Sequence, residues 1–126
     1  MSVIGIGTDI IEINRITVMS EQARNRLAKR ILTETEYAFY TTTKQPARYL
    51  AKRWSAKEAV SKALGTGIAK GVSFKHIEIQ SLPTGQPILQ LMDKALEVAT
   101  QLGASQWHVT LSDETNYATA FVVLSN

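Results

Sequence analysis

The stretch that decides the fold lies in the middle of the chain and reads KRWSAKEAVSKALG over residues 52–65. Apolar residues recur in it at the spacing of an α-helix. Pro46 suits the first turn of such a helix and Gly65 suits a left-handed helix end, so we expect one long central helix between them. Both sides of this helix should be covered, because one stripe carries Leu50, Trp54, Glu58, Ser61 and Gly65, and the far side carries Ala56, Ala59, Val60 and Ala63.

Glu58 and Lys62 stand one turn apart on this helix, so both side chains leave it on the same side. On an exposed helix this spacing is the commonest stabilising ion pair, and that ordinary reading competes with a catalytic one. A carboxylate on a covered helix is costly unless it is paired or binds a cation. Glu58 is therefore a candidate site residue, and a metal and a phosphate could bridge the pair.

A second carboxylate, Asp9, ends the apolar run VIGIGTDII of residues 3–11, which predicts a buried strand. An ionised Asp among isoleucines needs hydrogen bonds or a metal, although Asp at a strand end is also a common turn former. The pair Gly5 and Gly7 lacks the third glycine of a dinucleotide-binding fingerprint. These glycines indicate only a close approach of backbone.

Composition bounds the class of protein. The chain has 126 residues, which fits one domain over residues 1–126 with a real core. It contains no cysteine, which excludes disulfides, a thiol nucleophile and a cysteine-bound metal. We find no secretory leader pattern and no apolar run long enough to span a membrane, so we expect a cytoplasmic protein. The net charge of +3 favours acidic partners such as nucleic acid, nucleotides or an acidic protein.

The other patterns alternate between helix and strand. Helices are expected over residues 20–32, after Thr33 where a capping box with Glu36 opens a short helix, and over residues 92–102. Strands are expected over residues 3–11, 74–80, 88–91, 107–111 and 117–124. Together they predict an α+β domain in which a largely antiparallel five-stranded sheet wraps the central helix.

Three segments together resemble a known family. They are GIGTDI at residues 5–10, RWSAKEAVSKALGTG at residues 53–67 and HVTLSD at residues 108–113. In them the chain is similar to the holo-[acyl-carrier-protein] synthases, the small group-I type of 4'-phosphopantetheinyl transferase. The resemblance runs over nearly the whole chain, and one departure is Trp54, where the family often has phenylalanine.

The resemblance implies a 4'-phosphopantetheinyl transferase fold and a role in fatty acid biosynthesis. It implies transfer of 4'-phosphopantetheine from coenzyme A to a serine of apo-acyl carrier protein, with release of adenosine 3',5'-bisphosphate. Asp9 and Glu58 would hold Mg²⁺ together with the pyrophosphate of the coenzyme, since Mg²⁺ favours few carboxylates plus phosphate oxygens and waters. Lys62 would stabilise or protonate the leaving phosphate. Either Glu58 or a metal-bound water could take the serine proton.

The resemblance also suggests which other residues bind the two substrates. Arg48, Arg53 and His108 are candidates for the 3'-phosphate, although a strand histidine that only hydrogen-bonds and a surface arginine with a packed stem are ordinary alternatives. The expected coenzyme A site consists of Arg48, Arg53, Ser61, Lys62, Gly65, Thr66, Gly67, His108 and Thr110. Gly65, Thr66 and Gly67 could instead only stop the helix. Arg15, Arg24 and Arg26 lie where the family docks the acidic carrier protein, and a solvated helix face is their alternative.

Two other classes of function compete with the enzyme. One is a nucleic-acid-binding module, which would need aromatic residues exposed on strands among cations, and this is not the pattern of Trp54 and Phe74. The other is a noncatalytic nucleotide-binding regulator or scaffold. The family resemblance further implies a homotrimer with active sites between subunits, and five strands with few covering helices leave sheet surface to hide. Val109, Leu111, Phe121 and Val123 are expected near that shared surface.

Overall fold

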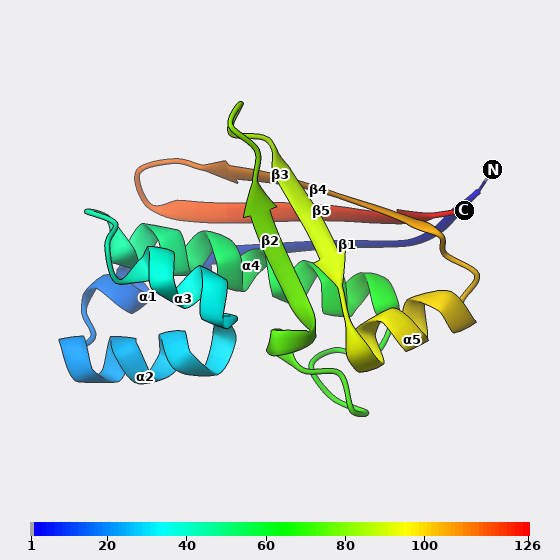
Figure 1. Cartoon of the computed structure of the whole chain (residues 1–126). Coiled ribbons are helices and arrows are strands. Elements are labelled where there is room, and N and C mark those ends of the chain that lie inside the picture. Colours follow the sequence, from blue (N-terminus) through cyan, green and yellow to red (C-terminus); the bar gives the residue numbers. More distant parts are fainter. Residues whose placement is uncertain (1) are drawn as a thin grey trace.

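The computed structural model describes residues 2–126 and is organised around α4 (Pro46–Leu64) (Figure 1). Pro46 occupies the first turn of α4, and Gly65 ends the helix in the left-handed conformation with φ of 78°. Both expected ends are confirmed. Eleven residues of α4 are buried, among them Leu50, Ala59 and Val60, so the helix is enclosed over most of its length as the two apolar sides predicted.

One side of α4 is covered by an antiparallel three-stranded sheet in the order β1 (Val3–Glu12), β5 (Tyr117–Ser125), β4 (Gln106–Asp113). The central strand β5 alternates strictly, and its buried residues Ala118, Ala120, Val122 and Leu124 pack into the core beside α4. Asp9 of β1 pairs with Ala120 in this register.

Strand β1 lies unusually close to α4 at its two glycines. A Cβ atom on Gly7 would stand 1.9 Å from the carbonyl oxygen of Ala59, and one on Gly5 would stand 2.3 Å from that of Ala63. No side chain can be accommodated at these distances, because the atoms it would meet belong to the backbone. The close approach expected from the glycine spacing is confirmed, and it brings β1 against the helix that carries Glu58 and Lys62.

The other side of α4 is crossed by a separate two-stranded sheet, β2 (Ile77–Ser81) and β3 (Pro87–Leu91) (Figure 1). The α+β class and the antiparallel pairing are confirmed, but the five strands divide into two sheets. Ile77, Ile79, Leu89 and Leu91 are buried in the same cluster as Val122 and Leu124, so α4 is enclosed between two apolar layers. Phe74–His76 form the 3-10 turn η1 capped by Ser73, and strand β2 therefore begins later than expected.

Three helices close one end of the molecule: α1 (Asn14–Thr17), α2 (Glu21–Ile31) and α3 (Glu34–Tyr40). The capping box of Thr33 and Glu36 is present at the start of α3. Helix α5 (Asp93–Gln101) lies at the opposite end. None of the helices within residues 2–126 is long and apolar enough to cross a membrane.

Candidate active site

Asp9, Glu58 and Lys62 come together where β1 passes α4. Asp9 follows the buried Gly7 by two residues, so its side chain lies on the helix side of β1. The ammonium of Lys62 donates to Asp9 Oδ1 at 3.0 Å and to the carbonyl oxygen of Thr8 at 2.9 Å. The side chain of Lys62 is 53% exposed and that of Asp9 17% exposed, so this pair faces solvent.

Glu58 is half-buried beside this pair. Burial raises the pKa of Glu58, and the negative charge of Asp9 raises it further, while Trp54, Lys62 and Arg30 act in the opposite direction. The indole N–H of Trp54 lies close enough to favour the carboxylate, yet its buried Nε1 atom has no partner of good hydrogen-bond geometry among residues 2–126. Two carboxylates that repel one another are therefore held together at the surface without full compensation.

The residues that follow Glu58 along α4 are used largely by the helix itself. The hydroxyl of Ser61 is buried and donates to the carbonyl oxygen of Glu58 at 2.7 Å. The backbone N–H of Gly65 donates to Lys62, and those of Thr66 and Gly67 donate to Ser61. These contacts end the helix, so any contact of this loop with a phosphate would need other groups than these N–H donors.

Arg48 and Arg53 line a pocket of about 550 Å³ between α3, α4 and β2. Arg48 donates to Asp113 at 2.8 Å and to the carbonyl oxygens of Glu114 and Thr115, which ties α4 to the turn between β4 and β5. Burial raises the pKa of Asp113, but the hydrogen bonds and charges of Arg48 and Lys52 outweigh it and lower the pKa overall. The pocket wall also contains Phe39, Tyr49, Lys52 and Ser81.

His108 and Thr110 lie elsewhere, on the outer face of the sheet. They are exposed and alternate along β4 with Val109 and Leu111, which pack against the core. In the register of the sheet His108 pairs with Val123 and Thr110 with Phe121. Of the four apolar residues expected near a surface shared between subunits, Phe121 and Val123 lie on this outer face, whereas Val109 and Leu111 point to the core, because successive residues of a strand point to opposite faces.

The expected coenzyme site thus falls into separate regions of one chain. Lys62 follows Arg53 by nine residues, which places it on the opposite side of α4 and about 13 Å further along the axis. His108 stands on the sheet face that points away from α4, whereas Asp9 points toward it. Asp9, Glu58 and Lys62 are brought into direct contact or mutual influence, while Arg48 and Arg53 share the pocket on the other side of α4.

The three arginines expected to dock a carrier protein differ in their surroundings. Arg15 is exposed, and its guanidinium stacks over the ring of Trp54 at 5.5 Å from the centroid. Arg26 is exposed on α2. Arg24 is half-buried, and its Nε donates to the hydroxyl of Tyr40 at 2.8 Å. Arg24 and Arg26, two residues apart on a helix, point to different sides of α2.

Comparison with known proteins decides the family. The model of the 4'-phosphopantetheinyl transferase superfamily matches residues 5–122. The holo-[acyl-carrier-protein] synthase of Shewanella amazonensis is 55% identical over 124 residues, which cover 98% of this chain and 99% of that protein. The chain belongs to the holo-[acyl-carrier-protein] synthase family.

Solved structures of this family agree with the fold. The holo-[acyl-carrier-protein] synthase of Neisseria meningitidis is 38% identical, with a TM-score of 0.88 over 99% of this chain and 100% of that one. The synthase of Bacillus anthracis, solved in complex with CoA (3',5'-ADP), is 38% identical, with a TM-score of 0.80 over 98% of each chain.

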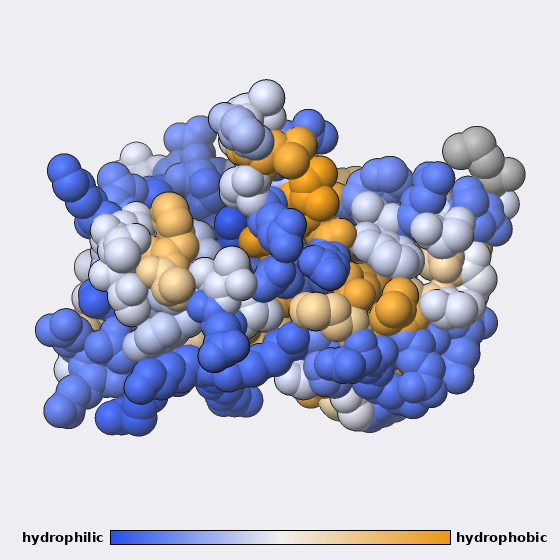
Figure 2. All heavy atoms as spheres, viewed as in Figure 1, coloured by the Kyte–Doolittle hydropathy of each residue, from blue (hydrophilic) through white to orange (hydrophobic). Residues whose placement is uncertain are grey.

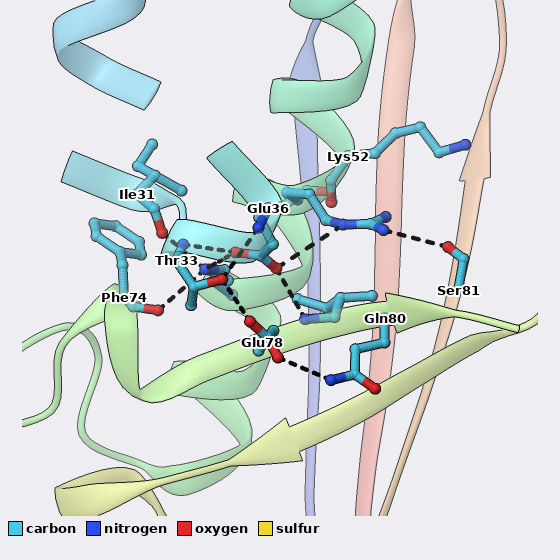
Figure 3. Close-up of polar contacts among 12 residues, drawn as sticks. Ile31, Thr33, Glu36, Lys52, Phe74, Glu78, Gln80 and Ser81 are labelled. Carbon is cyan, nitrogen blue, oxygen red and sulfur yellow. Dashed lines mark hydrogen bonds and ion pairs between the residues drawn. The ribbon is translucent and has the colours of Figure 1, made fainter. Parts of the chain in front are cut away.

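A buried polar cluster of Lys57, Glu36 and Arg53, whose Lys57–Glu36 pairing the sequence does not predict, lies next to the candidate site. Lys57 is fully buried, and its ammonium donates to Glu36 Oε1 at 2.6 Å (Figure 3). Glu36 is only 2% exposed, and Arg53 is 8% exposed beside it. A lysine within a helix that is covered on both sides indicates a buried ion pair. The partner of Lys57 lies 21 residues away, so no local sequence pattern identifies it.

Proposed function

We propose that the chain is a cytoplasmic enzyme that transfers 4'-phosphopantetheine from coenzyme A to a serine hydroxyl of apo-acyl carrier protein, leaving adenosine 3',5'-bisphosphate. The observation that carries this proposal is the meeting of Asp9, Glu58 and Lys62 at a solvent-facing position, in a chain that matches this family over its length. The relatives bear the name of this activity, and the Bacillus anthracis synthase was solved in complex with CoA (3',5'-ADP).

The two carboxylates fit a magnesium ion. Within residues 2–126 no group of three or more His, Cys, Asp or Glu side chains could enclose a metal. Mg²⁺ is commonly held by one or two carboxylates together with substrate phosphate oxygens and waters, so Asp9 and Glu58 are a suitable donor set. Burial first and the charge of Asp9 second raise the pKa of Glu58, and a cation bound between the two carboxylates would oppose both effects. When bound, the ion would supply neutralisation of charge on the pyrophosphate.

The chain's own residues account for the remaining steps. The serine oxygen forms a bond to the β-phosphorus of coenzyme A, and the bond from that phosphorus to the bridging oxygen breaks, so adenosine 3',5'-bisphosphate leaves. Glu58 would accept the serine proton. Lys62 has three N–H donors, and two of them go to Asp9 and to the carbonyl oxygen of Thr8 on β1, so the third would meet the leaving phosphate.

One assay tests the activity directly. The protein is incubated with coenzyme A, Mg²⁺ and an apo-acyl carrier protein, and the carrier is weighed by mass spectrometry. We expect one added phosphopantetheine on the carrier serine and loss of the reaction when the metal is chelated. A carrier of unchanged mass in the complete mixture would contradict the proposal.

We further propose that the active site is shared between copies in a homotrimer. Lys62 is expected at the pyrophosphate of the coenzyme and Arg53 at its 3'-phosphate. These residues lie on opposite sides of α4, so one coenzyme molecule would take each of them from a different copy. The outer face of the sheet leaves Ile6 62% exposed, Ile10 61% exposed and Phe121 44% exposed. Packing of copies through this face would bury these side chains and would carry His108 and Thr110 toward a neighbour's Asp9 and Glu58.

Mixing inactive chains tests the shared site. Glu58→Ala chains and His108→Ala chains should each be inactive alone, and a mixture that exchanges subunits should recover part of the activity because some interfaces hold both residues. Sedimentation at the assay concentration should report the trimer. A fully active monomer would contradict this arrangement.

Helix α2 is the proposed docking surface for the acidic carrier protein. It carries Arg24, Arg26, Lys29 and Arg30 against the single acid Glu21, and its surface is hydrophilic (Figure 2). With Arg15, these cations would steer association, and Arg24 would act partly through its bond to Tyr40. Reversal of Arg15, Arg24 and Arg26 to Glu should slow carrier association steeply at low salt and leave coenzyme affinity nearly unchanged. Equal losses for both substrates would contradict docking here.

A further inference from the structure

Lys57 is satisfied entirely inside the protein. Its ammonium donates to the carbonyl oxygen of Ile31 at 2.7 Å, to Glu36 Oε1 at 2.6 Å and to the carbonyl oxygen of Phe74 at 3.2 Å (Figure 3). A lysine ammonium has three donors, so none is left for a ligand. Lys57 is 0% exposed, and a direct catalytic role is therefore excluded.

Glu36 is shared unequally between two cations. Its Oε1 accepts from Lys57 and from the backbone N–H of Thr33 at 3.0 Å, and its Oε2 accepts from the N–H of Ile79 at 2.9 Å. Arg53 is more distant, with 3.9 Å between its Nε and Glu36 Oε2. The carboxylate is thus held by Lys57 and two backbone donors, and it compensates Arg53 only partly.

Arg53 is correspondingly short of partners. Among residues 2–126 its buried Nε has no hydrogen-bond partner, and its Nη2 donates to Ser81 Oγ at 3.3 Å. The guanidinium lies over the ring of Tyr49, 4.8 Å from the centroid, on the wall of the pocket. A nearly buried guanidinium with unused donors and one distant counter-charge is costly unless a ligand completes it.

We propose that Lys57 and Glu36 are positioning residues for Arg53: Lys57 holds the Glu36 carboxylate back, and Arg53 remains charged and free to bind a phosphate group of the coenzyme in the pocket. This inference rests on the proposed function. Lys57, Arg53 and Glu36 sum to one positive charge. The half-buried carboxylate of Glu78, held by hydrogen bonds from Thr33 and Gln80, also acts on Lys57 and stays the same in every variant below. Removing the charge of Lys57 would leave Glu36 free to pair closely with Arg53 and neutralise it.

The charge balance predicts opposite effects for two destabilising substitutions. Lys57→Met should raise KM for coenzyme A about tenfold and leave kcat within about twofold, because a binding contact is lost without a change at the reacting phosphorus. Glu36→Gln removes the charge that offsets Arg53, so KM should stay equal or fall by about threefold. The double variant restores a single positive charge and should return KM to within about threefold of the wild type.

A merely structural role would give another result. It would lower thermal stability in both single variants and would lower the apparent kcat in proportion to the loss of folded protein, while KM for coenzyme A stayed unchanged in both. Lys94→Met, at an exposed lysine that pairs with Glu97, serves as the matched control and should change neither KM nor kcat. If Lys57→Met does not fold, Glu36→Gln still decides, because a raised KM in that variant overturns the proposal.

Calorimetric binding of adenosine 3',5'-bisphosphate separates this inference from the proposed function. A wild type that neither binds the bisphosphate nor modifies the carrier refutes the function itself. An active wild type whose Lys57→Met variant binds the bisphosphate equally well refutes only the positioning role. A raised Kd in Lys57→Met, restored in the double variant, supports it.

Discussion

Lys57 and Glu58 are consecutive on α4, yet their side chains enter opposite kinds of surroundings. The Lys57–Glu36 pair has a distance of 2.6 Å and side chains that are 0% and 2% exposed. The Lys62–Asp9 pair, beside Glu58, has a distance of 3.0 Å and side chains that are 53% and 17% exposed. Both pairs join a carboxylate to a lysine, and they differ in how many of their hydrogen-bonding groups have partners.

The difference separates a pair that is complete within the fold from one that still has groups available for a ligand. Around Lys57 every donor finds an acceptor, and although burial lowers the pKa of Lys57, Glu36 opposes that change. Around Glu58 burial and the charge of Asp9 both raise the pKa, and the nearby indole nitrogen lacks a well-formed hydrogen bond within residues 2–126. The Lys57–Glu36 pair is complete without a ligand and stabilises the protein, whereas the carboxylates at the surface have groups available for a ligand.

The largest expected effect is the loss of activity when either surface carboxylate, Asp9 or Glu58, is removed. Asp9→Ala and Glu58→Ala should each lower turnover at least about a thousandfold, or about 4 kcal/mol, because each removes one of two proposed metal oxygens. Steady-state kinetics over a range of Mg²⁺ concentrations measure this. Glu12→Ala, at an exposed carboxylate on the same strand, is the control and should keep its turnover. Wild-type turnover in either site variant would show that the substituted carboxylate is not needed for activity, which would contradict the proposed contrast with the Lys57–Glu36 pair.

The next largest effect is on stability, at the buried Lys57–Glu36 pair. Glu36→Ala should lower the free energy of unfolding by about 3–5 kcal/mol, because it strands the buried Lys57 ammonium and removes the acceptor of two backbone donors. Small domains are stable by only about 5–15 kcal/mol, so the loss is large. Urea unfolding followed by circular dichroism measures it. Glu97→Ala, which removes an exposed ion pair with Lys94, is the control. A loss below about 1 kcal/mol in Glu36→Ala would show that the buried pair contributes little to the free energy of unfolding.

The sequence could predict those parts of both regions that local chemistry determines. Pro46 and Gly65 set the ends of α4, Thr33 and Glu36 set the start of α3, and the glycines of β1 indicate its approach to the helix. Asp9 and Glu58 are predictable as candidate site residues, because an ionised carboxylate in an apolar run is costly unless it is paired or binds a cation. The pairing of Lys57 with Glu36 and the division of the strands into two sheets depend on contacts between distant segments, which no window of sequence contains.

A moderate effect is expected where β1 meets α4. Gly7→Ala places a Cβ atom 1.9 Å from the carbonyl oxygen of Ala59 and 2.8 Å from the backbone nitrogen of Ala63, so β1 must move away from the helix. Overpacking of this kind costs about 1–3 kcal/mol. Asp9 is two residues further along and would move away from Lys62, so turnover should fall together with the unfolding midpoint. Retention of both properties would mean that the close approach does not position Asp9.

The smallest effect concerns the pH dependence of stability at Glu58. In the ligand-free protein the pKa of Glu58 lies above its ordinary value of 4.5, first through burial and then through Asp9, so the folded state keeps a proton that the unfolded state has already lost. Its contribution to stability is present below the unfolded pKa and is lost as the pH rises through the folded pKa. Glu58→Gln removes this loss, so the variant should match the wild type at the acidic end and be slightly more stable near neutral pH. Urea unfolding at intervals from about pH 4 to pH 8 in the presence of a chelator measures the difference. A variant that is less stable than the wild type at neutral pH would show that Glu58 is satisfied in the fold, which would remove the contrast with Lys57.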